Sequence, residues 1–319
     1  MLNMNLDIII PVYNAKETIK RLLYSIAIQR NAFGFHVYLV NDCSDYDYQE
    51  EVSFFKEYFD ITEFKLEKNG GPGVARQYGI DHTNSKYITF MDSDDYFYDP
   101  YAIVSMYSGA VGRKCDLLVS DFLYERDNKS VVQSKNLIWL HGKVYKRQFL
   151  TDNNIHFNNT KANEDNGFNR LVLLNNPIIA YIDRLTYVYS DYKDSITRRD
   201  NRMFKFTGLE GYTYNMCWAM EEMIKKNKNI EMVAETSAGV ITAMYYYYLE
   251  LYDKYDVSKI LKWTKKTKEI FDKYRNGYIK QYKIDYFLKA KEKEYEKANL
   301  KKVITFDEFL EKIEEAAHD

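Results

Sequence analysis

Three carboxylates, Asp92, Asp94 and Asp95, end a short apolar segment, residues 87–91, that is typical of a buried strand. The α/β folds bind ligands at the carboxyl ends of their parallel strands, and neighbouring carboxylates can share one hard divalent cation. A nucleoside diphosphate is the ligand that best explains a cation at this position. The alternative is a polar turn that caps the next helix, because aspartate-rich turns are common.

A second pair of acids, Glu164 and Asp165, precedes a segment whose apolar residues recur at helical spacing. The pair is therefore expected in the first turn of a helix, where the helix dipole favours an ionised carboxylate. An ionised carboxylate can act as a general base. The alternative is that the pair only caps this helix.

The segments that must position these acids alternate between strand and helix. Residues 6–10 form a β-rich run that Pro11 is expected to stop, and an amphipathic helix is predicted over residues 18–28. A second predicted strand, residues 36–40, runs into Asp42. This order predicts parallel strands whose polar ends share one edge of a sheet.

A glycine-rich turn at residues 69–73 leads into a predicted helix that carries Arg76. Glycines allow the backbone to approach a ligand closely, and a helix start with an arginine suits a phosphate group. The turn is neither a Walker loop nor a dinucleotide-binding loop, because it lacks the residues that define each of them.

The chain has 319 residues, enough for one large domain and a smaller one. Strand and helix patterns alternate up to about residue 200, after which helices are predicted over residues 203–226, 230–255, 258–297 and 306–317, the last opened by Thr305. We therefore predict a first domain over residues 1–200 and a helical second domain over residues 201–319.

The net charge of −2 conceals a strong asymmetry. Residues 254–302 contain sixteen Lys or Arg and seven Asp or Glu, a net charge of +9, which leaves −11 for the remainder. Interleaved aromatic residues at helical spacing favour a packed aromatic face with a solvated lysine face. The alternative is a basic surface that contacts an anionic partner such as teichoic acid, nucleic acid or a membrane leaflet.

Several protein classes are disfavoured by what the sequence lacks. No run of eighteen apolar residues occurs, and the first residues do not have the pattern of a signal peptide, so a membrane-spanning enzyme is not expected. The cysteines, Cys43, Cys115 and Cys217, are far apart and predict neither disulfides nor a metal site. We expect a cytoplasmic protein, with peripheral contact to an anionic surface through residues 254–302 as a further alternative.

Taken together, the motifs resemble family 2 glycosyltransferases with the GT-A fold over roughly residues 5–200. The segments that carry the resemblance are residues 8–14, 40–44, 69–76, 90–95, 141–147, 163–165, 187–189 and 195–197. The resemblance implies an α/β fold, a GT-A Rossmann-like mixed sheet with helices on both faces, followed by a smaller C-terminal helical region.

The resemblance also implies the activity, which is inverting transfer of a hexose or N-acetylhexosamine from a UDP-sugar to an acceptor hydroxyl. Asp165, next to Glu164, matches the general base, and Asp94 with Asp92 matches the site of Mn²⁺ or Mg²⁺, which would stabilise the leaving UDP. The positions that match residues binding the nucleotide sugar are Pro11, Tyr13, Asp42, Asn69, Gly71, Arg76, Asp92, Ser93 and Ser195.

Three positions depart from the family pattern. Asn41 replaces an acid, which weakens the expected hydrogen bond to the nucleotide. Cys43 replaces a glycine, which suggests that this turn does not need a positive φ. Ser190 stands where many relatives carry an arginine, and the choice between Lys193 and Arg198 as the cation that faces the diphosphate stays open.

Two other functions remain as alternatives at this stage, a non-catalytic nucleotide-sugar-binding protein and a nucleotidyltransferase. The retained Glu164 and Asp165 favour a catalyst over the first. The lack of a glycine- and lysine-rich loop near the N-terminus disfavours the second. The acceptor stays open among a glycan, teichoic acid, protein, lipid and nucleic acid, because a fold does not specify a substrate.

Overall fold

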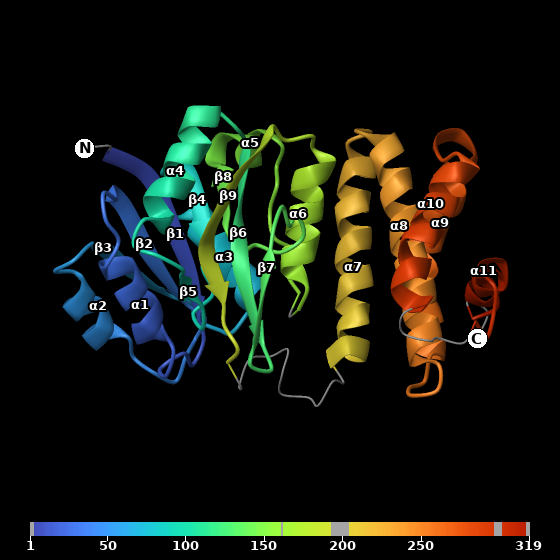
Figure 1. Ribbon diagram of the computed structural model, residues 1–319, viewed down its shortest axis with the longest axis horizontal. Coiled ribbons are helices and arrows are strands. Elements are labelled where there is room, and N and C mark those ends of the chain that lie inside the picture. Colours follow the sequence, from blue (N-terminus) through green and yellow to red (C-terminus); the bar gives the residue numbers. More distant parts are fainter. Residues whose placement is uncertain (1–2, 161, 193–203, 297–301, 317–319) are drawn as a thin grey trace. The chain divides into compact units, whose positions relative to one another are not determined.

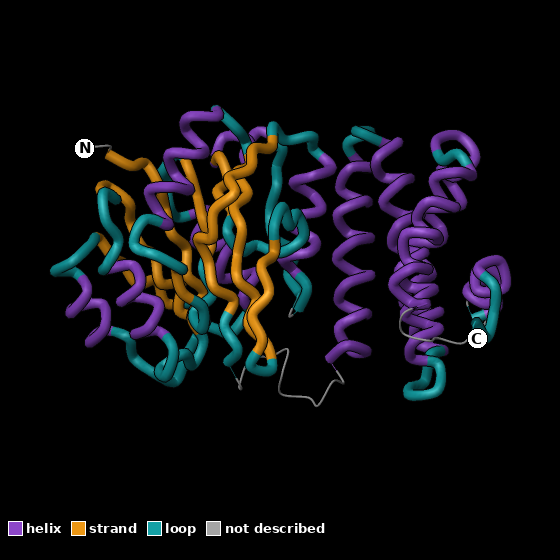
Figure 2. Tube along the Cα trace, in the orientation of Figure 1, coloured by secondary structure: helices purple, strands orange, loops and turns teal. Residues whose placement is uncertain are grey.

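The computed structural model describes residues 3–160, 162–192, 204–296 and 302–316. Contacts between Cα atoms divide the chain into two compact units, residues 1–199 and 200–319 (Figure 1). The first unit is built around a β-sheet, and the described part of the second contains helices and connecting loops (Figure 2).

The sheet of the first unit mixes parallel and antiparallel strands. Its described strands are β1 (Asn3–Val12), β2 (Phe33–Asn41), β3 (Asp60–Lys65), β4 (Tyr87–Phe90), β5 (Tyr96–Phe97), β6 (Leu117–Arg126), β7 (Lys129–Gln133), β8 (Lys143–Lys146) and β9 (Ile179–Tyr189). They lie in the order β3-β2-β1-β4-β8-β6-β9-β5, and β7 pairs with β6. The first four strands of this order are parallel, whereas β8 is antiparallel to both of its neighbours.

Helices cover both faces of this sheet, as the alternating side chains of β1 reveal. The described helices of the unit are α1 (Ile19–Ala27), α2 (Gln49–Phe55), α3 (Pro72–Asp81), α4 (Ala102–Arg113), α5 (Arg147–Asp152) and α6 (Glu164–Leu174). Ile8 and Ile10 belong to the core that also contains Leu22 of α1. Ile9 faces the other way, where a Cβ on Gly79 of α3 would lie 2.5 Å from its Cγ2. The predicted GT-A fold class is confirmed.

The prediction that Pro11 stops the first strand is wrong, because β1 continues to Val12 and Pro11 pairs with Val40. The carbonyl of Ile9 accepts a hydrogen bond from the backbone N–H of Met91, so the backbone polar groups of Ile9 point toward β4. In a strand, those of every second residue point the same way. The backbone nitrogen of Pro11 therefore points toward β4 as well, but the ladder between β1 and β4 ends at Ile9. The missing N–H of proline therefore costs no ladder hydrogen bond.

The described helices of the second unit are α7 (Phe204–Lys225), α8 (Ile230–Leu251), α9 (Ser258–Tyr278), α10 (Gln281–Glu296) and α11 (Phe306–Glu315). The other four all pack against α8, around a core that includes Ile241, Phe271 and Phe309. Thr305 opens α11, as predicted, and it forms a capping box with Glu308.

The prediction of one helix over residues 258–297 is wrong, because the backbone breaks between α9 and α10. Ile279 has extended angles, φ −110° and ψ 118°, and its side chain is buried in the core of the unit. Burial of this side chain accounts for a turn that the helical pattern did not reveal. No described helix is both long enough and apolar enough to cross a bilayer.

Candidate active site

Asp42, which directly follows β2, binds the glycine-rich turn that precedes α3. Its buried carboxylate accepts hydrogen bonds from the backbone N–H groups of Gly70, at 2.8 Å, and Gly71, at 2.7 Å. The side chain of Asn69 donates to the carbonyl of Asp42 at 3.3 Å. Gly71 has φ 88°, which glycine adopts readily, and Pro72 then begins α3. Hydrogen bonds therefore join the predicted residues Asp42, Asn69 and Gly71, which come from two different loops.

The turn that follows β2 corrects the expectation for Cys43, whose φ is 61°. The side-chain oxygen of Asn41 accepts from the backbone N–H of Ser44 at 2.9 Å, which closes the turn across Cys43. The amide nitrogen of Asn41 donates to Glu63 at 2.9 Å. Asn41 thus stabilises this turn, and Cys43 adopts the left-handed region without being a glycine.

Tyr13 lies just beyond β1 at the same edge of the sheet, and 53% of its surface is exposed. The next residue, Asn14, ties this loop to the one after β2, because its N–H donates to Ser44 Oγ at 3.0 Å. Pro11 is buried within β1. Of the two residues predicted to line a base pocket, only Tyr13 presents an open ring to solvent.

Arg76 joins the turn after β4 to the first turn of α6. Its guanidinium is buried and donates to Asp92 at 2.5 Å and to Glu164 at 2.6 Å. Gly73 allows α3 to approach α6, because a Cβ there would lie 2.9 Å from Glu164 Cγ. Burial opposes the charge of Arg76, but the two carboxylates raise its pKa above the usual value. Arg76, which matches a residue beside the nucleotide in the family, thus bridges two acids in the structure.

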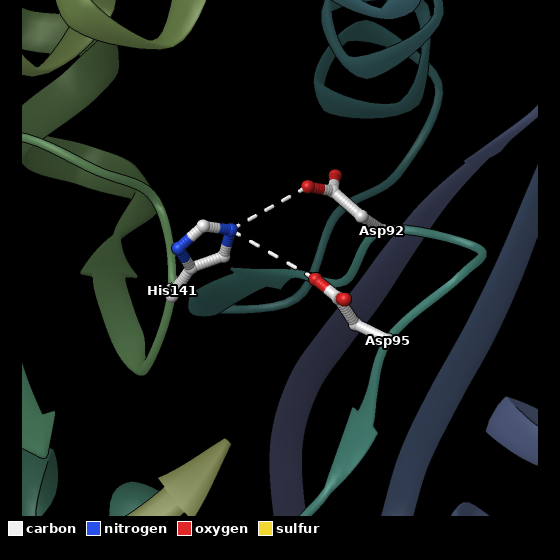
Figure 3. A group of neighbouring side chains, drawn as sticks. All are labelled: Asp92, Asp95 and His141. Atoms are coloured by element: carbon white, nitrogen blue, oxygen red, sulfur yellow. Dashed lines mark ion pairs between the residues drawn. The ribbon is translucent and has the colours of Figure 1, made fainter. Parts of the chain in front are cut away.

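Asp92, Asp95 and His141 bring three possible metal ligands within 4.8 Å of one another (Figure 3). His141 Nε2 lies 3.6 Å from one oxygen of Asp92 and 3.8 Å from one oxygen of Asp95. Burial lowers the pKa of His141, despite the proximity of Asp92, which favours the neutral imidazole. Burial would raise the pKa of Asp92, but Arg76 and His141 hold it below the usual value.

Asp95 is fully buried, and both oxygens of its carboxylate already accept hydrogen bonds. The donors are the hydroxyl of Tyr187, at 2.5 Å, and the backbone N–H of Ser190, at 2.9 Å. Burial, with the neighbouring Asp94 and Asp92, raises the pKa of Asp95 well above its usual value. Asp95 therefore anchors the end of β9 to the turn after β4, whereas Asp92 and Asp94 are partly exposed.

Asp165 lies in the first turn of α6, as predicted, and is partly exposed. One of its oxygens accepts from the backbone N–H of Asn166 at 2.8 Å. Burial, with the adjacent Glu164, raises the pKa of Asp165 to about 7. Burial also lowers the pKa of Lys143 on β8 to about 7, although the charge of Asp165 opposes this shift. The ammonium of Lys143 donates to the carbonyl of Trp139.

The remaining predicted residues have different outcomes. Ser93 lies in the turn with Asp92 and is partly exposed. Ser195, Lys193 and Arg198 lie outside the described residues. Residues that the sequence left without a role also reach the site, namely Arg21, Lys143 and Tyr187. The last two fall within motifs of the resemblance, whereas Arg21 had no signal beyond its place on the polar side of an amphipathic helix.

The chain is similar to known glycosyltransferases in sequence and in fold. Residues 7–162 match the family model described as glycosyl transferase family 2. Glycosyltransferase GlyA of Streptococcus pneumoniae is 26% identical over 222 residues, which cover 60% of this chain and 31% of GlyA. The poly(ribitol-phosphate) beta-N-acetylglucosaminyltransferase TarS of Staphylococcus aureus is 27% identical over 209 residues, which cover 60% of this chain and 36% of TarS.

The chain thus spans about a third of the length of these curated relatives. Among solved structures, S. aureus TarS 1–349 in complex with UDP-GlcNAc superposes with a TM-score of 0.69 at 20% identity, over 92% of both chains. A mannosyltransferase from Pyrobaculum calidifontis in complex with GDP-Man and Mn²⁺ has a TM-score of 0.56 at 12% identity, over 100% of this chain and 87% of that one. At these identities the superpositions establish a shared fold.

Proposed function

The chain belongs to glycosyl transferase family 2, and from this membership we propose that it transfers a hexose or N-acetylhexosamine from a UDP-sugar to an acceptor hydroxyl with inversion. The sequence relative TarS is named an N-acetylglucosaminyltransferase, and a TarS structure holds UDP-GlcNAc, which makes UDP-GlcNAc the first donor to test.

The observation that carries the proposal is the Arg76 bridge. One buried guanidinium contacts Asp92, in the turn proposed to bind the donor, at 2.5 Å and Glu164, next to the proposed base, at 2.6 Å. Bidentate or paired contacts of arginine with carboxylates fix geometry as well as charge. The bridge therefore holds the donor-binding turn and the start of α6 in one arrangement, which a transfer between two bound substrates requires.

The donor set at the turn after β4 fits Mn²⁺ or Mg²⁺, which favour oxygen ligands. We assign the metal to Asp94 with Asp92, because both are partly exposed, whereas Asp95 is buried with both oxygens engaged. His141 Nε2 lies 3.6 Å from the second oxygen of Asp92. A divalent cation bound here would neutralise the diphosphate of the leaving UDP.

Asp165 acts as the general base in this proposal. With a pKa of about 7, raised by burial and by Glu164, Asp165 is partly ionised near neutral pH, and its carboxylate is basic enough to accept a proton. The acceptor hydroxyl gives its proton to Asp165 while its oxygen bonds to the anomeric carbon. The bond from that carbon to the UDP oxygen breaks on the opposite face, which inverts the configuration.

For the acceptor we propose a poly(polyol phosphate) of the kind named in TarS. Lys262, Lys265 and Lys266 are exposed on α9, and none of them forms an ion pair with a described residue. Lys268, on the same helix, differs because it is buried between Asp272 and Glu314, at 2.5 Å from each. The exposed lysines give α9 a positive face that complements a chain of phosphodiesters.

The test is to incubate the full chain with a panel of UDP-sugars and Mn²⁺, with and without poly(ribitol phosphate), and to measure UDP release and product mass. We expect release from one donor, accelerated by the polymer and absent in Asp165→Asn. Binding of UDP-sugars without release would favour a non-catalytic binding protein. Release of pyrophosphate from UTP and a sugar phosphate would favour a nucleotidyltransferase instead.

A further inference from the structure

The turn after β4 concentrates negative charge, and a bound donor would add to that charge. Asp92, Asp94 and Asp95 follow one another within four positions, and a nucleoside diphosphate would add further negative charge. Arg76 does not offset the charge of the diphosphate, because its own charge is already paired with Asp92 and Glu164. In addition to a divalent metal at this turn, a cation without a carboxylate partner would stabilise the bound diphosphate.

Arg21 of α1 is a cation that lies against this turn. Its Nη2 donates to Ser190 Oγ at 2.7 Å and to the backbone carbonyl of Asp94. The guanidinium also lies over the ring of Tyr96, 4.8 Å from the ring centroid. These neutral contacts hold the side chain against the turn, and Arg21 forms no ion pair with any residue in the described part of the chain.

We propose that Arg21 binds the diphosphate of the nucleotide sugar from the α1 side of the turn, an inference that rests on the proposed function. Its Nε and Nη1 have no hydrogen-bond partner among the described residues, so N–H donors remain after the contacts of Nη2. Arginine suits phosphate because its planar fork can donate two parallel hydrogen bonds. Ser190 fixes the fork by accepting from it at 2.7 Å.

The experiment measures the binding of uridine, UMP and UDP to the full chain by calorimetry, both in Mn²⁺ and in EDTA. The variants are Arg21→Gln, which removes the charge, and Arg21→Lys, which keeps the charge but not the fork. Lys20→Gln is the matched control, because Lys20 is the preceding residue of α1 and points to Glu51 at 3.5 Å. Thermal unfolding of each variant checks that it is folded.

We expect Arg21→Gln to weaken UDP binding about 10- to 100-fold in both conditions, as for a lost charge-assisted hydrogen bond. UMP should lose less, uridine should lose nothing, and Arg21→Lys should fall between Arg21→Gln and the native protein. Lys20→Gln should bind all three ligands normally. This dependence on the number of phosphates is what direct contact with the diphosphate requires.

Two outcomes would overturn the inference while leaving the proposed function intact. The first is native UDP affinity in Arg21→Gln. The second is a loss that is equal for uridine and UDP, or that vanishes in EDTA, because Arg21 would then act only by shaping the turn. If the native protein binds no UDP in Mn²⁺, the proposed function fails and the inference fails with it.

Discussion

Replacing Asp165 with asparagine is expected to abolish sugar transfer while leaving UDP binding unchanged. Asparagine keeps the size of the side chain and an oxygen that can accept from the Asn166 N–H, a bond of 2.8 Å in the native protein. It cannot accept the proton of the acceptor hydroxyl. Loss of a general base costs about 10²- to 10⁴-fold in rate, so kcat should fall by that factor.

The same substitution is expected to stabilise the fold above neutral pH. Burial, with Glu164, raises the pKa of Asp165 from 3.8 to about 7. Between about pH 4 and pH 7 the unfolded chain loses this proton before the folded protein does, so the free energy of unfolding falls as pH rises. Three pKa units correspond to about 4 kcal/mol, which partial exposure reduces, so Asp165→Asn should gain about 1–4 kcal/mol at pH 8.

A capping role for Asp165 predicts the opposite sign, a loss of about 1 kcal/mol with native transfer. The assay therefore compares transfer from pH 6 to pH 9 and urea unfolding at pH 8. In the native protein kcat should rise through about pH 7 as Asp165 loses its proton. Asp307→Asn, in the first turn of α11, is the matched control and should change neither quantity. Near-native transfer by Asp165→Asn would remove Asp165 from the mechanism, and Glu164→Gln would be tested next.

Three further outcomes are expected. EDTA should stop transfer, and Mn²⁺ should restore it. Asp94→Ala should weaken UDP-sugar binding in Mn²⁺. Full activity in excess EDTA would exclude a role for a metal. Charge reversal at Lys262, Lys265 and Lys266 should raise the KM for poly(ribitol phosphate), less so at high salt, with donor hydrolysis unchanged; an unaltered KM would mean that these lysines are only solvated. Arg76→Met should lower the free energy of unfolding by about 3–5 kcal/mol, because its carboxylate partners lose their counter-charge; native stability in thermal unfolding would contradict this.

The fold class followed from local patterns in the sequence. Apolar runs that end in acids predict buried parallel strands, and β2 and β4 have this character. Because parallel strands end at one edge, Asp42 and Asp92 were expected near each other before any contact was known. The acids in the first turn of α6 and the capping box of Thr305 were also predictable, since both depend on residues three or four apart.

Local patterns failed where a distant contact decides the backbone. The break at Ile279 depends on a side chain that is buried in the core of the second unit, and helical periodicity carries no sign of it. The positive φ of Cys43 depends on how the Asn41 side chain closes its turn. Residue type alone suggested the reverse.

The partners of the arginines were decided by tertiary structure alone. Arg76 meets Asp92 and Glu164, which lie 16 and 88 positions further along the chain, and Arg21 meets the carbonyl of Asp94, 73 positions away. Sequence pattern identifies the charged side chains that a strand end or a helix can present. Which of them meet depends on the order of strands in the sheet and on how closely α3 approaches α6, and these are properties of the packed core.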